Sequence, residues 1–315
     1  MKVVTQTVII HALLHCTYGI AEHTSYSKRD SVKCESLEKF NSNRKYGYKT
    51  NCAVACNQLA NKLCVGFRRK DSSCELCTVC NDNTSAIQNI SQSMFFINHQ
   101  EELYKDLFIH ITMDSILNDV IPAIGTAVKV LGSPGPYVTE GKYDGAIYLP
   151  NQHTYDGKYI SLGRHTNDCL DNLNLCPNGM TLSVWFKAAQ QVHPWPHIFT
   201  STTFIVFMEV TTGEPVLNVN LFTDANQLFL YSTGTVITID KWHLLSITYS
   251  KGELKIYYDG CDLKTQPSIL QESRTVRDFE LGCMAGGNCA KISYDDFRFW
   301  KAAKDARFIQ WLWQM

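Results

Sequence analysis

Cysteine is the residue type with the most evident chemistry in this chain. The sequence of 315 residues contains 13 cysteines, and paired cysteines are typical of a protein made in an oxidising compartment. Cys16 lies in an apolar N-terminal segment, and the other twelve form two groups of seven and five. They are Cys34, Cys52, Cys56, Cys64, Cys74, Cys77 and Cys80, then Cys169, Cys176, Cys261, Cys283 and Cys289. Because both groups are odd, they cannot both pair internally.

Only one pairing follows from spacing alone. Cys169 and Cys176 are separated by a short loop, which favours a local disulfide. For the two odd cysteines we expect a bridge between one of Cys74, Cys77 or Cys80 and one of Cys261, Cys283 or Cys289, or else a disulfide-linked dimer. A free exposed thiol is a liability in an oxidising space, so two free cysteines are the less favoured outcome.

Zinc binding is the alternative for the first group. Cys74-x-x-Cys77-x-x-Cys80 and Cys52-x-x-x-Cys56 could supply the four thiolate ligands that a tetrahedral zinc site needs. An oxidising compartment favours disulfides instead.

A second motif, His193-Pro194-Trp195-Pro196-His197, presents two imidazoles and an indole on a proline-stiffened loop. Such a loop could bind a metal or a ligand. The favoured interpretation is a rigid turn whose Trp195 covers an edge of the fold.

Catalytic spacings are missing. A glycosidase strand of the form Glu-x-Asp-x-Glu places alternate carboxylates on one face, about 7 Å apart, and no such spacing occurs. Glu209 has no carboxylate two residues away, and the neighbours Asp295 and Asp296 are expected to point to opposite faces of a strand. A Gly-x-Ser-x-Gly elbow is also missing. The sequence therefore predicts a protein that is not an enzyme, with a glycan-active enzyme as the outside alternative.

Strand patterns must position these groups. Met180 to Lys187 places Leu182, Val184 and Phe186 on one side and Trp185 on the other. Lys241 to Asp259 contains two apolar runs around a Ser-Lys-Gly-Glu turn, which predicts a β-hairpin. The expected core of the domain is built on Leu182, Val184, Trp185, Phe186, Trp242, Leu244, Ile247, Leu254 and Ile256.

The N-terminal segment resembles a secretory signal. Lys2 is followed by an apolar run and then by Gly19-Ile20-Ala21, which predicts cleavage after Ala21 and a signal at residues 1–21. No later run is long enough to span a bilayer. Asn83-Thr-Ser and Asn89-Ile-Ser are glycosylation acceptors. We therefore expect a secreted, extracellular glycoprotein.

Residues 31–100 form a small cysteine-rich α+β module. Cys52 to Leu63 is expected to be a short helix with Cys52 and Cys56 on one face, and Cys64 to Arg69 and Cys74 to Cys77 an antiparallel hairpin. A helix pinned to a hairpin by cysteines resembles the PAN/apple module. That resemblance implies pairing of Cys56 with Cys64, of Cys52 with Cys74 or Cys77, and of Cys34 with Cys80. Seven cysteines instead of six depart from the family pattern.

After about residue 108 come short strand-like runs separated by Gly, Pro, Asn and Asp, which predicts an all-β sandwich at residues 108–315. Gly141 to Leu149, Leu182 to Lys187, Trp242 to Tyr249 and Tyr294 to Trp300 resemble, in that order, the laminin G-like and pentraxin-like jelly roll of the concanavalin A-like lectin superfamily. The resemblance implies recognition of glycan or matrix protein through the sandwich loops, and it makes calcium possible. No cofactor is otherwise expected.

Four loop residues carry side-chain oxygens of the type that binds calcium, but they do not form a known calcium-loop motif. They are Asp144, Asp156, Asp224 and Asn226.

The most favoured function is that of a secreted recognition or adhesion protein, and the alternative is a structural component of an extracellular matrix. Basic groups in the first module, Arg44 to Lys49 and Arg68 to Lys70, could bind acidic polysaccharide, although a solvated surface explains them as well. A net charge of −1 favours no partner class, and nucleic acid is not expected for a secreted chain.

Overall fold

The computed structural model describes residues 25–29, 32–34, 36–41, 63–70, 73–79, 88–90, 94–98, 100–126, 128–132, 137–151, 157–166, 168–210, 213–222, 228–250, 252–267, 277–284 and 287–315. The cleavage position after Ala21, the acceptor Asn83, most of the helix expected at Cys52 to Leu63, and Cys80 lie outside these residues. The chain divides into two units, one of Met1–Lys105 with Asp305–Met315 and one of Asp106–Lys304. Each unit is described by itself.

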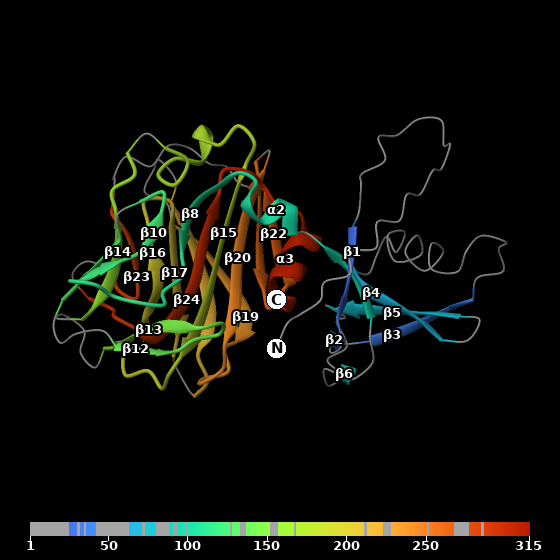
Figure 1. The fold of residues 1–315 in the computed structure, drawn as a ribbon. Helices are drawn as coiled ribbons and strands as arrows, with labels where there is room; N and C mark the ends of the chain where they lie inside the picture. Colours follow the sequence, from blue (N-terminus) through green and yellow to red (C-terminus); the bar gives the residue numbers. More distant parts are fainter. Residues whose placement is uncertain are drawn as a thin grey trace. The chain divides into compact units, whose positions relative to one another are not determined.

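The first unit contains a five-stranded sheet in the order β1-β7-β4-β5-β3 and a two-stranded pair β2-β6 (Figure 1). Antiparallel pairing of β4 with β5 confirms the hairpin expected from Cys64 to Cys77. The disulfide pairing of Cys34, Cys64, Cys74 and Cys77, which lie in these strands, stays a prediction. The elements are β1 (Ser25–Arg29), β2 (Val32–Cys34), β3 (Ser36–Asn41), β4 (Leu63–Lys70), β5 (Ser73–Val79), β6 (Gln88–Ile90), β7 (Met94–Asn98), α2 (Gln100–Tyr104) and α3 (Ala306–Gln314).

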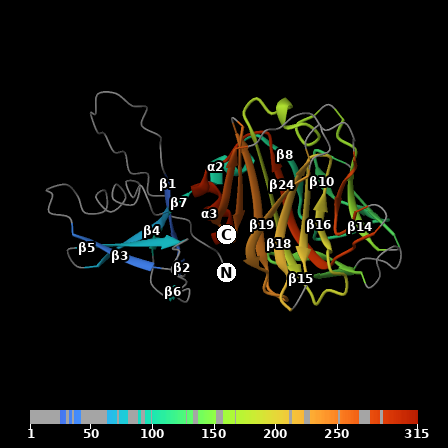
Figure 2. The same cartoon turned by 180° about the vertical axis from the view of Figure 1, so that it is seen from behind.

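The second unit is an antiparallel β-sandwich, as the sequence predicts. A nine-stranded sheet has the main order β10-β8-β24-β15-β20-β21-β22, and the hairpin β12-β13 joins it through β24. An eight-stranded sheet has the order β19-β18-β17-β16-β23-β14-β11-β9. Figure 1 shows β15, β20 and β24 side by side, and the view from behind in Figure 2 shows β16 and β18 of the other sheet.

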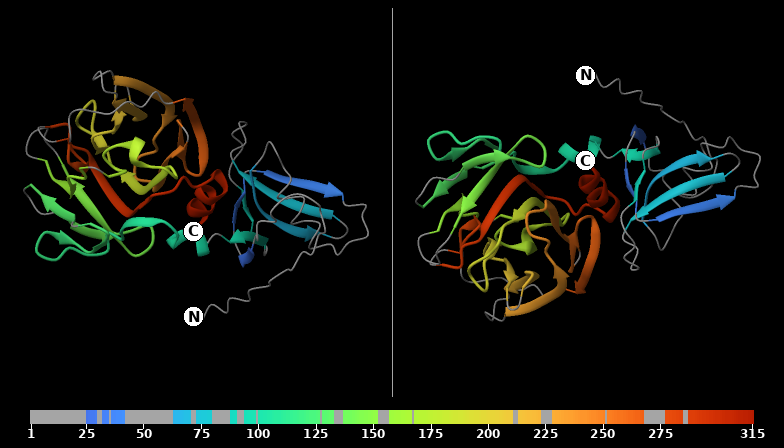
Figure 3. Two further views of the ribbon diagram at one scale, coloured as in Figure 1. Left: turned by 90° about the horizontal axis from the view of Figure 1, so that it is seen from above. Right: turned by 90° about the horizontal axis from the view of Figure 1, so that it is seen from below.

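The strands of this unit are β8 (Leu107–Ile111), β9 (Val120–Ile121), β10 (Ala123–Ile124), β11 (Val128–Leu131), β12 (Tyr137–Glu140), β13 (Gly145–Pro150), β14 (Tyr159–Gly163), β15 (Met180–Ala188), β16 (His197–Thr200), β17 (Phe204–Glu209), β18 (Val216–Phe222), β19 (Leu228–Val236), β20 (His243–Ser250), β21 (Glu253–Tyr258), β22 (Cys261–Pro267), β23 (Phe279–Leu281) and β24 (Lys291–Trp300). A short 3-10 turn, η1, spans Leu173–Leu175. Figure 3 shows the strand layers from above and below.

The core lies between the two sheets and follows the period-two alternation of the strands. Leu182, Val184 and Phe186 of β15 are fully buried in it. The neighbouring strand β20 pairs with β15 on one side and β21 on the other, which confirms the expected hairpin. Opposite them, the eight-stranded sheet contributes a row of buried apolar residues across five strands: Val219, Val206, Phe199, Leu281 and Ile160.

Two tryptophans expected in this core lie elsewhere. Trp185 is only 3% exposed, but it is on the opposite face of β15 from the core residues. The Tyr143 ring packs edge-on against it at 6.2 Å, and the Lys142 ammonium lies 4.8 Å from its ring centroid. Trp242 is half-buried and carries the Lys187 ammonium 5.1 Å from its ring. The burial expected for Trp185 is confirmed, but alternation places it, with Leu244 opposite it on β20, outside the cluster between the sheets.

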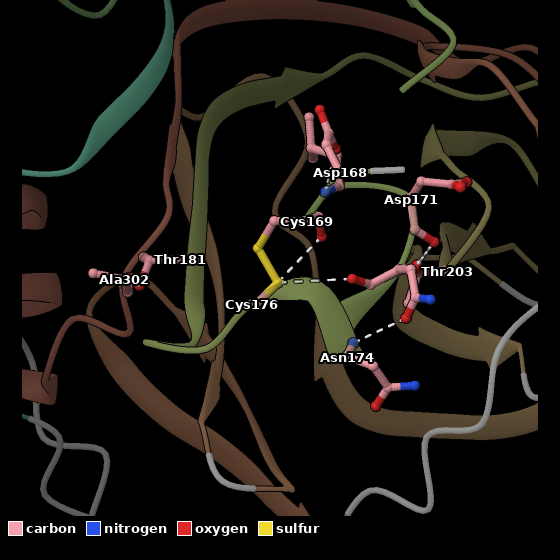
Figure 4. The surroundings of a disulfide bond; sticks show 10 residues. Asp168, Cys169, Asp171, Asn174, Cys176, Thr181, Thr203 and Ala302 are labelled. Atoms are coloured by element: carbon pink, nitrogen blue, oxygen red, sulfur yellow. Dashed lines mark hydrogen bonds between the residues drawn. A yellow bond between two sulfur atoms is a disulfide. The ribbon is translucent and has the colours of Figure 1, made fainter. Parts of the chain in front are cut away.

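Two disulfides lie in this unit. Cys169 bonds to Cys176, the pair that spacing suggests, beside the η1 turn. In Figure 4 the Cys176 sulfur lies against the Cys169 carbonyl, and the Thr203 hydroxyl donates to the Asp171 carbonyl and holds the loop. Cys283 bonds to Cys289. Cys261 is disulfide-bonded as well and belongs to neither pair. Of the prediction for the odd cysteines, the identity of the Cys261 partner stays a prediction.

Asp295 and Asp296 do not point to opposite faces, which corrects the sequence expectation. The pairing of β24 with β15 shifts register between Asp295, opposite Trp185, and Arg298, opposite Ser183. This β-bulge is centred on Asp296, whose φ is +50°. The extra residue brings both carboxylates to the outer face of the nine-stranded sheet. There Asp296 contacts Arg298 at 2.5 Å and His110 at 2.6 Å.

Asp295 clamps the turn between β12 and β13 over Trp185. Its Oδ2 accepts hydrogen bonds from the Lys142 and Tyr143 amides, at 2.7 and 3.0 Å. The turn also needs glycine at both ends, since a Cβ on Gly141 would lie 2.2 Å from the Gly145 carbonyl oxygen, and a Cβ on Gly145 would lie 2.7 Å from the Asp114 Cα. Burial, and to a lesser degree the charges of Asp296 and Asp114, raise the pKa of Asp295 to about 6.

We predict that Trp185→Ala lowers the free energy of unfolding by about 3 kcal/mol, because it leaves a cavity beneath the clamped turn. Trp195→Ala is the matched control, since half of that side chain is exposed and its loss should change stability by no more than about 0.5 kcal/mol. Urea denaturation monitored by circular dichroism measures both. Equal stabilities for Trp185→Ala and the wild type would show that Trp185 packing contributes nothing.

A second prediction concerns the pH dependence of stability. The folded protein raises the pKa of Asp295 from its ordinary value of 3.8 to about 6, so between these values the folded state binds more protons than the unfolded state. Stability should therefore fall as the pH rises through this window, by at most roughly 3 kcal/mol. Asp295→Asn keeps an acceptor without the charge, so it should gain stability relative to the wild type at pH 7.5 and little at pH 4.5.

The exposed Asp240 provides the control for that experiment, because Asp240→Asn removes a charge of the same sign from the surface. Denaturation curves at both pH values measure the difference between each variant and the wild type. A constant difference between Asp295→Asn and the wild type at the two pH values would contradict the prediction.

Candidate ligand-binding loop

The Trp195 loop, residues 189–196, joins β15 to β16 and is held to the sandwich by its backbone. On its far side the Val210 amide donates to the Pro194 carbonyl at 2.8 Å, and the Met208 amide donates to the Pro196 carbonyl at 2.9 Å. The His197 amide, which follows the loop, donates to the Asn288 carbonyl at 2.9 Å. Pro194 and Pro196 have no N–H, so their backbones take part in these bonds through their carbonyls alone. Their rings also restrict φ. The loop is therefore fixed at its C-terminal end.

The tip of the loop presents apolar surface to solvent. Val192 is 77% exposed and Trp195 is 50% exposed. The Trp195 amide donates to His193 Nδ1 at 3.0 Å, and the two rings lie edge to face at 6.3 Å. The sequence suggested that Trp195 covers an edge of the sandwich. Its exposure shows that it does not. It is an exposed aromatic group on a restrained loop.

The two histidines of the motif have separate roles. His197 is 5% exposed and packs edge-on against Phe207 at 6.1 Å. Burial, with a smaller effect from the charges of His193 and Arg277, lowers the pKa of His197 to about 4, so it is neutral at physiological pH. His193 Nδ1 is already occupied by the Trp195 amide. The motif does not form an imidazole pair for a metal.

The outer face of the eight-stranded sheet continues from the loop. Phe207 of β17 pairs with His197 on one side and with Asn218 of β18 on the other, and all three face away from the core. The Asn218 amide nitrogen donates to Glu209 Oε2 at 3.3 Å and to the Val216 carbonyl at 3.2 Å, which fixes the orientation of this carboxamide. Glu209 precedes Val210, whose amide binds the loop. A carboxylate thus lies next to the base of the Trp195 loop.

Three buried polar atoms on this face have no hydrogen-bond partner among the described residues: Asn218 Oδ1, Asn220 Oδ1 and His197 Nδ1. An unpaired buried acceptor costs about 1 to 3 kcal/mol. Asn218 and Asn220 are two residues apart on one strand, so their side chains share the same side of the sheet. Both side chains are buried, so a ligand on the surface does not reach these atoms.

The arrangement suits binding better than acid–base chemistry. An exposed indole offers an apolar face for stacking, and the neighbouring carboxylate of Glu209 offers hydrogen bonds that orient a polar ligand. Asp295 and Asp296 lie on the other sheet, where backbone amides, His110 and Arg298 already occupy them. These two carboxylates are accounted for by the bulge and the clamped turn.

Of the four residues proposed as calcium ligands, one lies in the part of the chain that the structure describes. Asp144 lies in the turn between β12 and β13, whereas Asp156, Asp224 and Asn226 are outside the described residues. Within the described ranges, no group of three or more His, Cys, Asp or Glu side chains is arranged to hold a metal ion. In the same part of the chain, no helix is long and apolar enough to cross a membrane.

Sequence reasoning found the exposed Trp195 motif but missed its partners. Asn218, Glu209 and Gln191 carry no local signal, because their contacts with the loop or its neighbours depend on strand register. The one usable hint was the polar–apolar alternation of β18, in which Asn218 and Asn220 interrupt Leu217, Val219 and Leu221.

Residues 159–310 match the model of the concanavalin A-like lectin/glucanases superfamily. No curated protein sequence matches the chain. Among solved structures, one described as cell entry of botulinum neurotoxin type C dependent on two ganglioside molecules is 13% identical, with a TM-score of 0.51, over 69% of this chain and 52% of that one. The binding domain of botulinum neurotoxin DC in complex with SialylT is 13% identical, with a TM-score of 0.50, over 66% of this chain and 51% of that one.

Domain 4 of AbnA, a GH43 extracellular arabinanase from Geobacillus stearothermophilus solved with arabinotriose, is 16% identical with a TM-score of 0.49, over 66% of this chain and 98% of that one. The chain thus spans about half the length of the two toxin structures. At these identities the likeness concerns the fold alone. The family match, together with the likeness to the two toxin structures, shows that the sandwich has the concanavalin A-like lectin/glucanase fold.

Proposed function

We propose that this chain is a secreted recognition protein that binds glycan through the Trp195 loop and the neighbouring carboxylate of Glu209. The observation that carries the proposal is the half-exposed Trp195 on a loop fixed by backbone hydrogen bonds. A sugar ring has apolar C–H faces, which stack on an indole, and hydroxyl groups, which donate to acceptors such as the partly exposed Glu209. A restrained loop binds with a smaller loss of conformational entropy.

The fold supports this proposal at a coarse level. Of the solved structures with the same fold, one is described as a complex with SialylT and one as dependent on two ganglioside molecules. Since this chain covers about half of each, their binding sites are not transferred to it. The proposal rests on the chemistry of the loop, and it treats the protein as a binding module without catalytic activity.

We further propose that the first unit is a PAN/apple-like module of this secreted protein. We infer that residues 1–21 are a signal peptide and that Asn83 and Asn89 carry glycan. Asn89 lies in β6, which pairs with β2. Among the described strands, none pairs with the other edge of β6. We infer that Cys261, which belongs to neither pair of its own unit, bonds to one of Cys74, Cys77 or Cys80 or to a second chain.

Binding is tested on an array of glycans and matrix proteins with protein secreted from eukaryotic cells, in calcium and in chelator. Wild type should bind a defined set of glycans, and Trp195→Ala should lose at least about tenfold in affinity, because one stacked aromatic ring contributes more than about 1.4 kcal/mol. Leu117→Ser, which removes an exposed apolar residue elsewhere on the sandwich, should bind as the wild type does. Binding to matrix proteins alone, or equal glycan binding by Trp195→Ala, would refute the glycan proposal.

Secretion and modification are tested on the same material. N-terminal sequencing should begin at about Glu22, and removal of N-glycans should lower the apparent mass. The shift should shrink in Asn83→Gln, in Asn89→Gln, or in both. Secreted protein that retains Met1 would contradict the signal-peptide assignment.

A further inference from the structure

The buried Gln191 makes an unusual set of hydrogen bonds at the N-terminal end of the Trp195 loop. Its Nε2 donates to the Ala189 carbonyl at 2.6 Å and to the Lys291 carbonyl at 2.8 Å. Its Oε1 accepts from the Lys291 amide at 2.9 Å. The residue is 8% exposed, and it is 100 positions away from Lys291 in the sequence. One side chain therefore occupies both backbone groups of Lys291.

This carboxamide takes the place of a peptide group in the ladder between β15 and β24. The last paired residues are Ala188 and Ile292, and the Ala189 amide donates to the Lys291 carbonyl at 3.0 Å. In a regular antiparallel pair the Ala189 carbonyl would accept from the Lys291 amide, but here the Gln191 carboxamide lies between these two groups and bonds to both. A primary amide carries the donor and the acceptor that a peptide group carries, and among side chains only Gln and Asn have both in this form.

The loop is consequently held at both ends. Gln191 fixes the first end on β24, while the amides of Met208 and Val210 fix the second on β17. Between these points lie the exposed Val192 and Trp195, whose positions are set by the two anchors and by the contact of Trp195 with His193.

We infer that Gln191 is a positioning residue for ligand binding: it holds the Trp195 loop in the conformation that presents the indole, without touching the ligand. This inference rests on the proposed function for its role in binding, but the effect on the loop does not. If the loop is released, only a fraction of the molecules present Trp195 correctly, and the apparent dissociation constant rises by the inverse of that fraction.

Gln191→Glu is the sharpest test, because it keeps the shape of the side chain and removes the donor. The introduced carboxylate faces the carbonyl oxygens of Ala189 and Lys291 in a buried site, so it is repelled when ionised and its pKa rises. At pH 7.4 the loop should be released. At pH 5 the protonated acid can donate to one carbonyl and accept from the Lys291 amide, so the loop should return.

The matched control is Gln190→Glu, which makes the same change at the exposed neighbouring position. His193 and Lys291, the nearest ionisable side chains on the loop and on β24, are present in both variants and in the wild type, so their titration cancels in the comparison. Gln191→Met removes the hydrogen bonds without adding charge and replaces Gln191→Glu if that variant does not fold.

The first readout needs no ligand. Protein labelled with 5-fluorotryptophan gives a fluorine resonance for Trp195, assigned by its loss in Trp195→Phe. In Gln191→Glu this resonance should shift or broaden at pH 7.4 and return to the wild-type position at pH 5, while Gln190→Glu should match the wild type at both values. An unchanged Trp195 resonance in Gln191→Glu at pH 7.4, or the same change in Gln190→Glu, overturns the inference.

The second readout is the affinity for the strongest glycan found on the array. We expect Gln191→Glu to bind about tenfold more weakly at pH 7.4, mainly through a slower association rate, and to recover to within about twofold of the wild type at pH 5. A wild type that binds no glycan contradicts the proposed function while the fluorine experiment still decides the role of Gln191. Wild-type affinity in Gln191→Glu at pH 7.4 contradicts the positioning role alone.

Discussion

Burial of one face of each sheet against the other is the constraint on which the second unit depends. Every core strand must alternate in step with its neighbours, because a shift of one residue would turn an apolar row toward solvent. Leu182, Val184 and Phe186 satisfy this on one sheet, and Val206 and Val219 satisfy it on the other. All features of functional interest are departures from this regular pattern, at places where a strand ends or bulges.

The bulge at Asp296 shows how such a departure creates local chemistry. One additional residue in β24 places Asp295, Asp296 and Arg298 on the same side of the sheet, and the second half of the strand then pairs with β8 instead of β13. The clamped turn fills the position where the partner strand changes. A group of charges that would be costly in a core is satisfied here by backbone amides and ion pairs.

Regular elements of this fold could be predicted from sequence, because their signals are local. Alternation in β15 and in the hairpin β20-β21 identified both strands and the side that Leu182 and Ile256 face. Spacing identified the Cys169–Cys176 pair. The same reasoning failed at Asp296, since a positive φ at an aspartate leaves no mark as clear as a glycine. It failed for the direction of Trp195, because the prolines show that the loop is stiff, whereas the strands β17 and β24 decide where it points.

The substitution of a side-chain amide for a peptide group at Gln191 has a consequence for how this loop can vary. Because the ladder is completed by Gln191 rather than by continuing backbone, the segment between Gln191 and Pro194 makes no contribution to the pairing of β15 with β24. Its length and composition can change while both sheets keep their register. The scaffold thus separates the residues that maintain the fold from those that meet a ligand, which allows new specificities to arise by loop exchange.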